Sequence, residues 1–387
     1  MPEASDGSEL LKRHLPVLRY DSQGSFMADS PAILTNRIAP NGEANGLKRA
    51  DGAVIATAAG GRRRPRLGLE FLGWPKYADG ARAARSDFLD ASGQDYVLQA
   101  REMHRGDFAD RIHGHATRAE DGGWWLQYWF FYLYNDKAFL GFGLHEGDWE
   151  MVQVRLDADE KPQAMAFAQH THGQRCRWDV VTRQDEQRPV VFVARGSQAS
   201  YPFAGKHSAP VVPDYADGKG AEVDDPRLEV IDTDQQGWVH WPGRWGSSKA
   251  RNRLESTSPR GPAHQDKWAE PETFHEECDQ VERPRAAPRA APTGPPKLEI
   301  SARREGERAV IGYRFARTPR QPMPVQLTVT LDSPDDELPP ATYAYPVDGA
   351  SGEIEHPLPL EEKRYEVRAS AADEQGNVGE QAVTELR

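Results

Sequence analysis

Hydrophobic and polar positions predict two long neighbouring strands between Trp124 and Leu156. In the first, Trp124–Tyr134, both sets of alternate positions carry aromatic or other apolar side chains. A strand that is apolar on both faces is typical of the centre of a sheet covered on each side. The second, Asp148–Leu156, alternates more regularly, so its valines share one face with the two acidic residues at its start.

Shorter runs predict a short helix at Leu10–Leu15, a longer helix and further strands around this pair. Asp87–Arg105 is the best helical candidate, with acidic residues near its start, and we expect it to cover one side of the sheet. The other predicted strands are short apolar or alternating runs bounded by turn residues. They are Pro16–Tyr20, Phe108–Ala116, Gln163–His170 and Pro189–Ala194.

The C-terminal part of the chain has a different character. Residues 281–296 repeat proline and alanine, which favours an extended, semi-rigid linker. Five strands then follow with turn residues between them, as in a small sandwich of immunoglobulin or fibronectin type. These strands are Leu298–Ala302, Ala309–Phe315, Val325–Leu331, Ala341–Pro346 and Tyr365–Ala371.

The predicted fold class is therefore all-β. A large β-sandwich with long loops and a few helices is expected over residues 1–280. The linker over 281–296 separates it from the immunoglobulin- or fibronectin-like sandwich over 297–387. The second sandwich has no cluster of histidine or cysteine, so we expect the chemistry to lie in the first.

Composition restricts the partners. The chain has 387 residues and a net charge of −12, which argues against nucleic acid because phosphate neutralisation needs a basic surface. No window approaches the ~20 apolar residues of a membrane span. No secretory signal is visible, so a cytoplasmic location is expected by default, with non-standard export left open. Cys176 and Cys278 form no disulfide framework, and their pairing is an alternative only if the chain is exported.

Acidic residues gather at one end of the predicted central strands. Asp148 and Glu150 share a face, His145 lies three residues upstream, and Asp136 follows the preceding strand. Carboxylates are rarely buried unless they are paired or bind a cation. The four residues therefore predict a metal site, and their oxygen-rich set favours Mg²⁺ or Ca²⁺, with Mn²⁺ and Zn²⁺ as alternatives. The structural alternative is a hydrogen-bonded polar cluster with an arginine partner.

His170 is the fifth candidate ligand. If Gln163–His170 pairs antiparallel with the strand before it, its end returns toward the carboxylates. His170 with His172 and Cys176 does not match a recognised structural zinc pattern. If the site is catalytic, Glu150, His145 or His170 would be the base, with Glu150 and His170 as the main candidates.

Three tryptophans, Trp238, Trp241 and Trp245, lie close together in a loop-rich region. They form either part of the core or a platform that stacks on a sugar or lipid. Packing is favoured, because aromatic rings usually serve it. With Arg195 they are nevertheless the candidate ligand-contacting residues.

Three motifs carry a resemblance to a known family. They are His145-Glu-Gly-Asp-Trp-Glu150, Gln169-His170 and Ala194-Arg-Gly-Ser-Gln-Ala-Ser-Tyr-Pro202. In this order they resemble the vacuolar protein sorting-associated protein 62-related family, whose motifs are approximately HEGDWE, SQH and ARGSHASYP. The resemblance covers about residues 10–280. Gln198 stands where that family usually has histidine, so any contribution of that histidine is absent or altered.

A more remote resemblance is to the necrosis- and ethylene-inducing-like proteins. Their GHRHDWE motif holds a divalent cation in a β-sandwich that recognises sphingolipid headgroups. The resemblance implies that His145, Asp148 and Glu150 match the motif's first His, its Asp and its Glu, and that Asp136 matches an acidic ligand. Gly147 replaces the motif's second His, so the role of that His is not carried over.

Two functional hypotheses follow. In the first, a cation-loaded sandwich binds a polar ligand such as a lipid headgroup, a glycan or a phosphate. In the second, the same cation activates water for hydrolysis of a phosphoester or similar substrate. The cluster is only as large as one ion shell requires, which favours binding. A purely structural metal is a third alternative.

Overall fold

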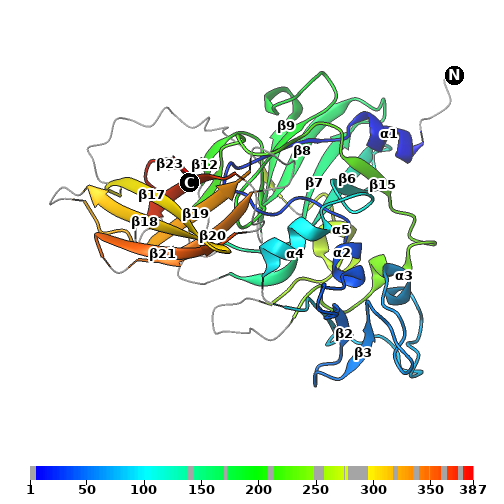
Figure 1. Ribbon diagram of the computed structural model, residues 1–387. Coiled ribbons are helices and arrows are strands. Elements are labelled where there is room, and N and C mark those ends of the chain that lie inside the picture. The colour runs from blue at the N-terminus through cyan, green and yellow to red at the C-terminus, as the bar shows by residue number, and fades with distance from the viewer. Residues whose placement is uncertain are drawn as a thin grey trace.

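The computed structural model describes residues 6–93, 95–137, 143–169, 172–207, 213–247, 257–273, 275–277, 295–316, 321–333, 340–347, 349–358, 364–373 and 378–386. Most regular structure in these ranges is β-strand, and two bodies of packed sheets lie side by side (Figure 1). The prediction of an all-β chain of the sandwich type is confirmed. Most of the predicted linker lies outside the described residues, and the domain boundaries stay predictions.

A seven-stranded sheet forms the centre of the N-terminal body. Its strands, in spatial order, are β15 (Arg227–Val230), β5 (Arg111–Arg118), β6 (Trp124–Asn135), β7 (His145–Leu156), β8 (Pro162–Gln169), β9 (His172–Arg177) and β16 (Glu276–Glu277). The two long strands predicted from the apolar pattern are β6 and β7, in the middle of this sheet. Every residue of β6 after Trp124 is buried, as expected of a strand covered on both faces.

The register of β6 and β7 decides where the acidic residues lie. The two strands pair antiparallel from Trp124 opposite Leu156 to Asn135 opposite His145. Asp148 lies opposite Tyr132, two positions from Glu150, at the same end of the sheet. The predicted hairpin between β7 and β8 is also confirmed, because these strands pair antiparallel across a short turn.

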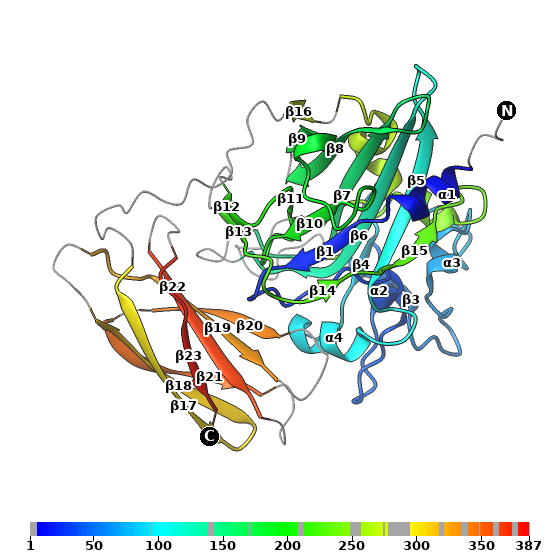
Figure 2. The ribbon, with the colours of Figure 1, turned by 90° about the horizontal axis from the view of Figure 1, so that it is seen from above.

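A smaller sheet covers one face of the central sheet. Its strands, in spatial order, are β11 (Ser200–Tyr201), β10 (Val190–Val193), β1 (Val17–Tyr20) and β14 (Glu222–Val223). Helix α1 (Gly7–Arg13) lies beside it, and the carbonyl of Leu11 accepts a hydrogen bond from the Tyr128 hydroxyl at 3.0 Å. Figure 2 shows β1, β10 and β11 lying over β6 and β7.

Short helical turns and aromatic rings cover the other face. The turns are η2 (Gly237–His240), η3 (Pro262–His264) and α5 (Asp266–Ala269). Trp149 of β7 lies 5.3 Å from Trp245 and 6.0 Å from Trp238 between ring centroids. These rings close the core on this side.

The predicted helix Asp87–Arg105 is only partly correct. Residues Phe88–Asp90 form strand β4, and helix α4 covers Tyr96–Met103. Asp95 caps α4 by accepting the amide N–H of Leu98 at 2.9 Å. Asp87 instead lies buried, where it accepts the Ala84 amide N–H at 2.8 Å, so it cannot begin a helix.

The other elements of this body are short. They are α2 (Ala32–Asn36), β2 (Gly46–Lys48), β3 (Val54–Thr57), α3 (Leu69–Leu72), η1 (Trp178–Val180), β12 (Gly205–His207) and β13 (Asp214–Ala216). Strands β3, β2 and β4 form a small sheet, and β12 pairs with β13. Among the described residues, no helix has both the length and the apolar character needed to cross a membrane.

The C-terminal body has one sheet of three strands and one of four. The first has the order β17 (Lys297–Glu305), β18 (Arg308–Ala316), β21 (Ser351–Pro357). The second has the order β20 (Ala341–Pro346), β19 (Gln326–Asp332), β22 (Glu366–Ala372), β23 (Ala382–Glu385). Strands β21 and β23 were not predicted, because their polar residues give too little hydrophobic signal. The immunoglobulin or fibronectin identity of this body stays a prediction.

The two bodies are joined by direct hydrogen bonds. The Thr342 amide donates to the Ser25 hydroxyl at 2.9 Å, and the Tyr343 hydroxyl donates to Asp95 at 2.8 Å. Arg368 donates to the Ser22 carbonyl at 3.1 Å. The segment after β1 therefore forms much of the contact between the bodies.

Candidate functional site

Three segments that are far apart in the sequence meet at one end of β6 and β7. Asp136 directly follows β6, and its amide donates to the carbonyl of Gly196 at 3.1 Å. Gly196 belongs to the turn between β10 and β11, and β11 lies against β7. A Cβ atom at Gly196 would lie 2.9 Å from the Cα of Lys137, so glycine permits this close approach. The third segment is the start of β7.

The turn after β10 is held by its own backbone and by one aspartate. The Gln198 amide donates to the Ala194 carbonyl at 3.1 Å, and Gln198 has a positive φ of 53°. The Ser197 hydroxyl donates to Asp214 at 2.7 Å. Asp214 also accepts the Tyr201 hydroxyl at 2.7 Å and pairs with Lys137 at 2.9 Å. Sequence analysis did not identify Asp214, because its role depends on contacts between distant segments.

His145 and Asp148 come together at the start of β7. The His145 Nε2 atom lies 3.5 Å from the Asp148 Oδ1 atom. Its Nδ1 atom lies 2.9 Å from the Gly143 carbonyl, so we assign the proton to Nδ1. Nε2 then carries the lone pair that a metal ion needs. Asp148 also accepts the Asn135 side-chain amide at 3.0 Å.

Glu150 and Asp136 are buried, and each has an oxygen atom without a hydrogen bond. Among the described residues, Glu150 Oε2 and Asp136 Oδ1 have no hydrogen-bond partner. Burial raises the pKa of Asp136 to about 7. Burial, together with the nearby charge of Asp148, holds the pKa of Glu150 well above its usual range. The charge of the buried Lys267 lowers the pKa of Glu150, and Gln198 and Arg195 lower the pKa of Asp136, but burial outweighs these neighbours at both carboxylates.

Glu146 provides a contrast within the same strand. Its carboxylate accepts the Ala91 amide at 3.1 Å, the Ser247 amide at 3.0 Å and the Tyr96 hydroxyl at 2.7 Å. Buried carboxylates of this chain can thus be fully hydrogen-bonded. The lack of partners at Glu150 is therefore a local property of the site.

Within the part of the chain that the structure describes, two more oxygen atoms without hydrogen-bond partners lie in the turn after β10 and at the start of β11. They are the side-chain carbonyl oxygen of Gln198 and the hydroxyl of Ser200, both buried. A neutral amide oxygen and a hydroxyl are ordinary ligands of a hard cation. Gln198 occupies the position at which the family motif has histidine, so the change from nitrogen to oxygen fits the oxygen-rich set.

His170 lies outside the described residues, and the structure does not place it. The residue before it, Gln169, ends β8 and donates to the Ser200 carbonyl at 3.4 Å. The end of β8 therefore reaches the turn that contacts Asp136, as the predicted hairpin requires. Cys278 also lies outside the described residues, so its pairing with Cys176 stays an open alternative.

The three tryptophans lie in the core. Trp238, Trp241 and Trp245 are 4%, 1% and 0% exposed, so none presents an open ring to a ligand. The packing alternative accounts for them, and we do not propose them as ligand contacts. Arg195 is different, because its half-buried guanidinium lies 4.7 Å from the ring centroid of Tyr215.

A second group was missed by sequence analysis. Among the described residues, one set of three acidic or histidine side chains has ligand atoms within 4.8 Å of one another, namely Asp29, His104 and Asp110. The predicted metal residues do not form so tight a set. Asp29 Oδ1, however, already lies 2.9 Å from His104 Nδ1 and accepts the Asp110 amide at 3.0 Å. These bonds explain the group as a link between α4 and its neighbours.

Comparison with known proteins agrees with the motif resemblance. No protein-family model matches this chain. The chain is 27% identical over 172 residues to a protein of Saccharomyces cerevisiae named "Putative vacuolar protein sorting-associated protein TDA6". The match covers 33% of this chain and 36% of that protein, so the chain spans about a third of the length of this relative. The match supports the resemblance to the vacuolar protein sorting-associated protein 62-related family.

Solved toxin structures are also similar, at low TM-scores. Necrosis and ethylene inducing protein 2 from the causal agent of cocoa's witches' broom disease has a TM-score of 0.32 and 12% identity, covering 71% of this chain and 93% of that chain. NLPPya in complex with glucosamine has a TM-score of 0.31 and 11% identity, covering 70% and 90%. At these TM-scores the likeness carries no argument about this chain.

Proposed function

We propose that this chain binds a divalent cation through Asp136, Asp148 and Glu150, and that the cation holds a polar ligand. His145 and His170 would complete the shell. Mg²⁺ or Ca²⁺ fits the predominance of oxygen donors. The ligand classes that suit open positions on such an ion are a glycan, a lipid headgroup or a phosphate.

The observation that carries the proposal is the set of buried oxygen atoms without partners. An ionised carboxylate buried without compensation costs several kcal/mol. Among the described residues Glu150 Oε2 and Asp136 Oδ1 lack a hydrogen-bond donor, and burial outweighs their charged neighbours, while Glu146 in the same strand has three donors. A cation would supply the missing compensation for the first two and is not needed by the third.

The same set of acidic and histidine residues favours ligand binding over hydrolysis. A metal-dependent hydrolase needs a base that does not ligate the ion. The three described carboxylates are all required for the shell, which leaves His170 as the remaining candidate base. Glu150 is better suited as a ligand than as a base, because it is 5% exposed and a base must reach substrate or water.

Calorimetry of the metal-stripped protein tests the proposal. We expect saturable binding of Mg²⁺ or Ca²⁺, with Mn²⁺ and Zn²⁺ as further titrants, and loss of that binding in Asp148→Asn and Glu150→Gln. Glu146→Gln is the matched control, because it makes the same chemical change in the same strand at a satisfied carboxylate. Unchanged binding in both site variants would refute the site. A screen of glycans, headgroups and phosphoesters on the loaded protein would then separate binding from turnover.

A further inference from the structure

We propose that the cleft between the two bodies binds a small phosphate-bearing molecule, with Arg195 as its main anion contact. The cleft has a volume of about 640 Å³, within the ~300–1,000 Å³ range of small-molecule sites. One wall comes from the segment after β1, the turn after β10 and the β12–β13 ribbon, and the other comes from β22 and β23. Figure 2 shows β12 and β13 on the side of the N-terminal body that faces β22.

The charged side chains that line the cleft carry a net positive charge, whereas the chain as a whole is negatively charged. Four are basic and three are acidic, whereas the chain as a whole carries a net charge of −12. The basic residues are Arg195, Lys206, Lys219 and Arg368, and the acidic residues are Asp21, Asp217 and Glu366. This local excess of positive charge favours an anionic ligand.

The three acidic side chains already have donors. Asp21 accepts the amides of Gln23 and Asp217, each at 3.0 Å. Asp217 accepts the amide of Ser22 at 2.8 Å and its hydroxyl at 2.6 Å. Glu366 pairs with Arg368 at 2.8 Å. The acids of the wall therefore hold the backbone and one arginine in place, and Asp21 acts on Arg195 through its charge without a direct ion pair.

Within the described chain, Arg195 is a cation without a direct ion pair, although its charge lowers the pKa of Asp21 and of Asp136. Among the described residues it forms no ion pair with a carboxylate within 4.0 Å, although it is half-buried. Its guanidinium stacks on Tyr215, and Lys206 Nζ lies 5.7 Å from the centroid of the same ring. The Tyr215 hydroxyl accepts the amide of Val378 at 3.2 Å, so the C-terminal body helps to hold the ring. A stacked guanidinium keeps its edge for bidentate contact with a phosphate.

The remaining lining suits an organic phosphate better than a bare ion. Val383 of β23 lines the cleft and is 55% exposed, which offers an apolar contact to a carbon skeleton. Gln381 adds an amide that can bond hydroxyl groups. A sugar phosphate or a phosphorylated headgroup combines these features.

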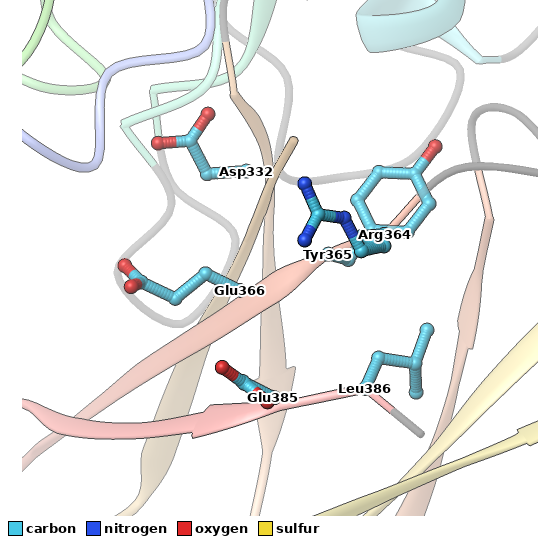
Figure 3. A pocket seen from close by; sticks show the side chains of 6 residues that line it. All are labelled: Asp332, Arg364, Tyr365, Glu366, Glu385 and Leu386. Atoms are coloured by element: carbon cyan, nitrogen blue, oxygen red, sulfur yellow. The ribbon is translucent and has the colours of Figure 1, made fainter. Parts of the chain in front are cut away.

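A smaller cavity in the C-terminal body lacks this character. It measures about 250 Å³, and Figure 3 shows the carboxylates of Asp332, Glu366 and Glu385 on one side and Arg364 on the other. Its carboxylates outnumber its cation, and Asp332 and Glu366 both pair with Arg368. It therefore offers no comparable anion site.

The proposal rests on side chains other than the proposed cation ligands, although the charge of Arg195 lowers the pKa of Asp136. Arg195 and Gln198 belong to the same turn, but Arg195 lines the cleft while the Gln198 side chain is buried. Loss of phosphate binding with cation binding retained, or the reverse, therefore identifies which of the two sites has failed.

Titration of the full chain with glucose 6-phosphate, with glucose as the uncharged control, tests the cleft. We expect glucose 6-phosphate to bind, and Arg195→Gln to weaken binding by about tenfold or more, since a charge-assisted bidentate contact is lost. Lys219→Gln, at an exposed position, should weaken it by a few-fold. Arg303→Gln is the matched control, because Arg303 is exposed and pairs with Glu353 outside the cleft.

Vesicles of phosphatidylcholine with and without phosphatidylinositol 4-phosphate form the second arm. Binding only to the phosphorylated vesicles identifies a lipid headgroup, and binding of glucose 6-phosphate identifies a soluble source. The proposal is overturned if neither probe binds, if glucose binds as well as its phosphate, or if folded Arg195→Gln and Lys219→Gln variants bind like Arg303→Gln. Circular dichroism establishes that each variant is folded.

Discussion

The two faces of the β6–β7 pair are covered in different ways, one by aromatic rings and the other by a polar turn. On one face Trp149 packs against the rings of Trp238 and Trp245. On the other, Asp148 and Glu150 approach the turn after β10, where oxygen atoms lack hydrogen-bond partners among the described residues.

The difference separates packing from binding. An aromatic face is complete once neighbouring rings fill it, since dispersion and burial need no partner of a particular charge. A carboxylate face is complete only when donors or a cation are supplied. On the aromatic face the described atoms that lack partners include the neutral indole N–H groups of Trp149 and Trp245, which cannot ligate a cation, whereas the carboxylate face leaves acidic oxygen atoms that can.

The largest expected effect is at the aromatic face. Trp245→Ala should lower the free energy of unfolding by about 3–5 kcal/mol, because it opens a cavity among buried rings. Denaturant unfolding measures this change. Trp74→Ala, at a ring that is 49% exposed, should cost much less. Equal effects at the two positions would contradict the comparison.

The next largest effect is expected at Gly147 of β7, where the backbone closely approaches the backbone of Trp245. This residue has a positive φ of 60°, and a Cβ atom there would collide with the carbonyl oxygen of Trp245. Gly147→Ala should therefore destabilise the fold by about 3 kcal/mol. Gly42→Ala is the control, since Gly42 has a φ of 85° with open space around it. A loss no greater than the control's would show that the close approach is unimportant.

On the carboxylate face, a substitution at Glu150 should increase the stability of the protein, in contrast to the two substitutions above. In metal-free protein, Glu150→Gln should raise the free energy of unfolding by about 1–3 kcal/mol, because the burial that raises the pKa of Glu150 outweighs the attraction of Lys267. Glu146→Gln should lower stability, because it weakens three hydrogen bonds. Thermal unfolding after chelation compares the two variants. Destabilisation by both would mean that Glu150 is compensated within the protein.

The smallest effect is the pH response of His113, which lies edge-on to Trp149 and Trp238. Burial lowers the pKa of His113 to about 3, from an ordinary value of about 6.5. As pH falls below 6.5 the unfolded chain takes up a proton that the folded chain refuses, so stability falls by about 1.4 kcal/mol per pH unit down to about pH 3. Its charged neighbours are Arg111 and Glu229, the latter at 3.9 Å.

Denaturant unfolding of wild type and His113→Phe at pH 7 and at pH 5.5 measures this response. The variant should lose less stability than wild type over the interval, by about 1.4 kcal/mol. Parallel losses in the two proteins would exclude His113 as the source. Because the comparison is between two proteins, other titrating groups cancel.

Local patterns were enough to predict the central strands and one cluster. The apolar faces of Trp124–Tyr134 and the alternation after Asp148 correspond to β6 and β7, because side-chain direction in a strand follows from a period of two. The same period placed Asp148 and Glu150 together. Helix Asp87–Arg105 was overestimated, because buried contacts of Asp87 compete with helical pairing.

Sequence alone determined the sandwich class, the β6–β7 pair and the shared face of its two carboxylates, because each is an interaction between near neighbours in the chain. The tertiary structure decided which buried groups are satisfied. It brought Asp214 to the turn after β10, joined Asp29 to His104, and placed Arg195 beside Tyr215. These pairings depend on how distant segments pack, and no local periodicity carries that information.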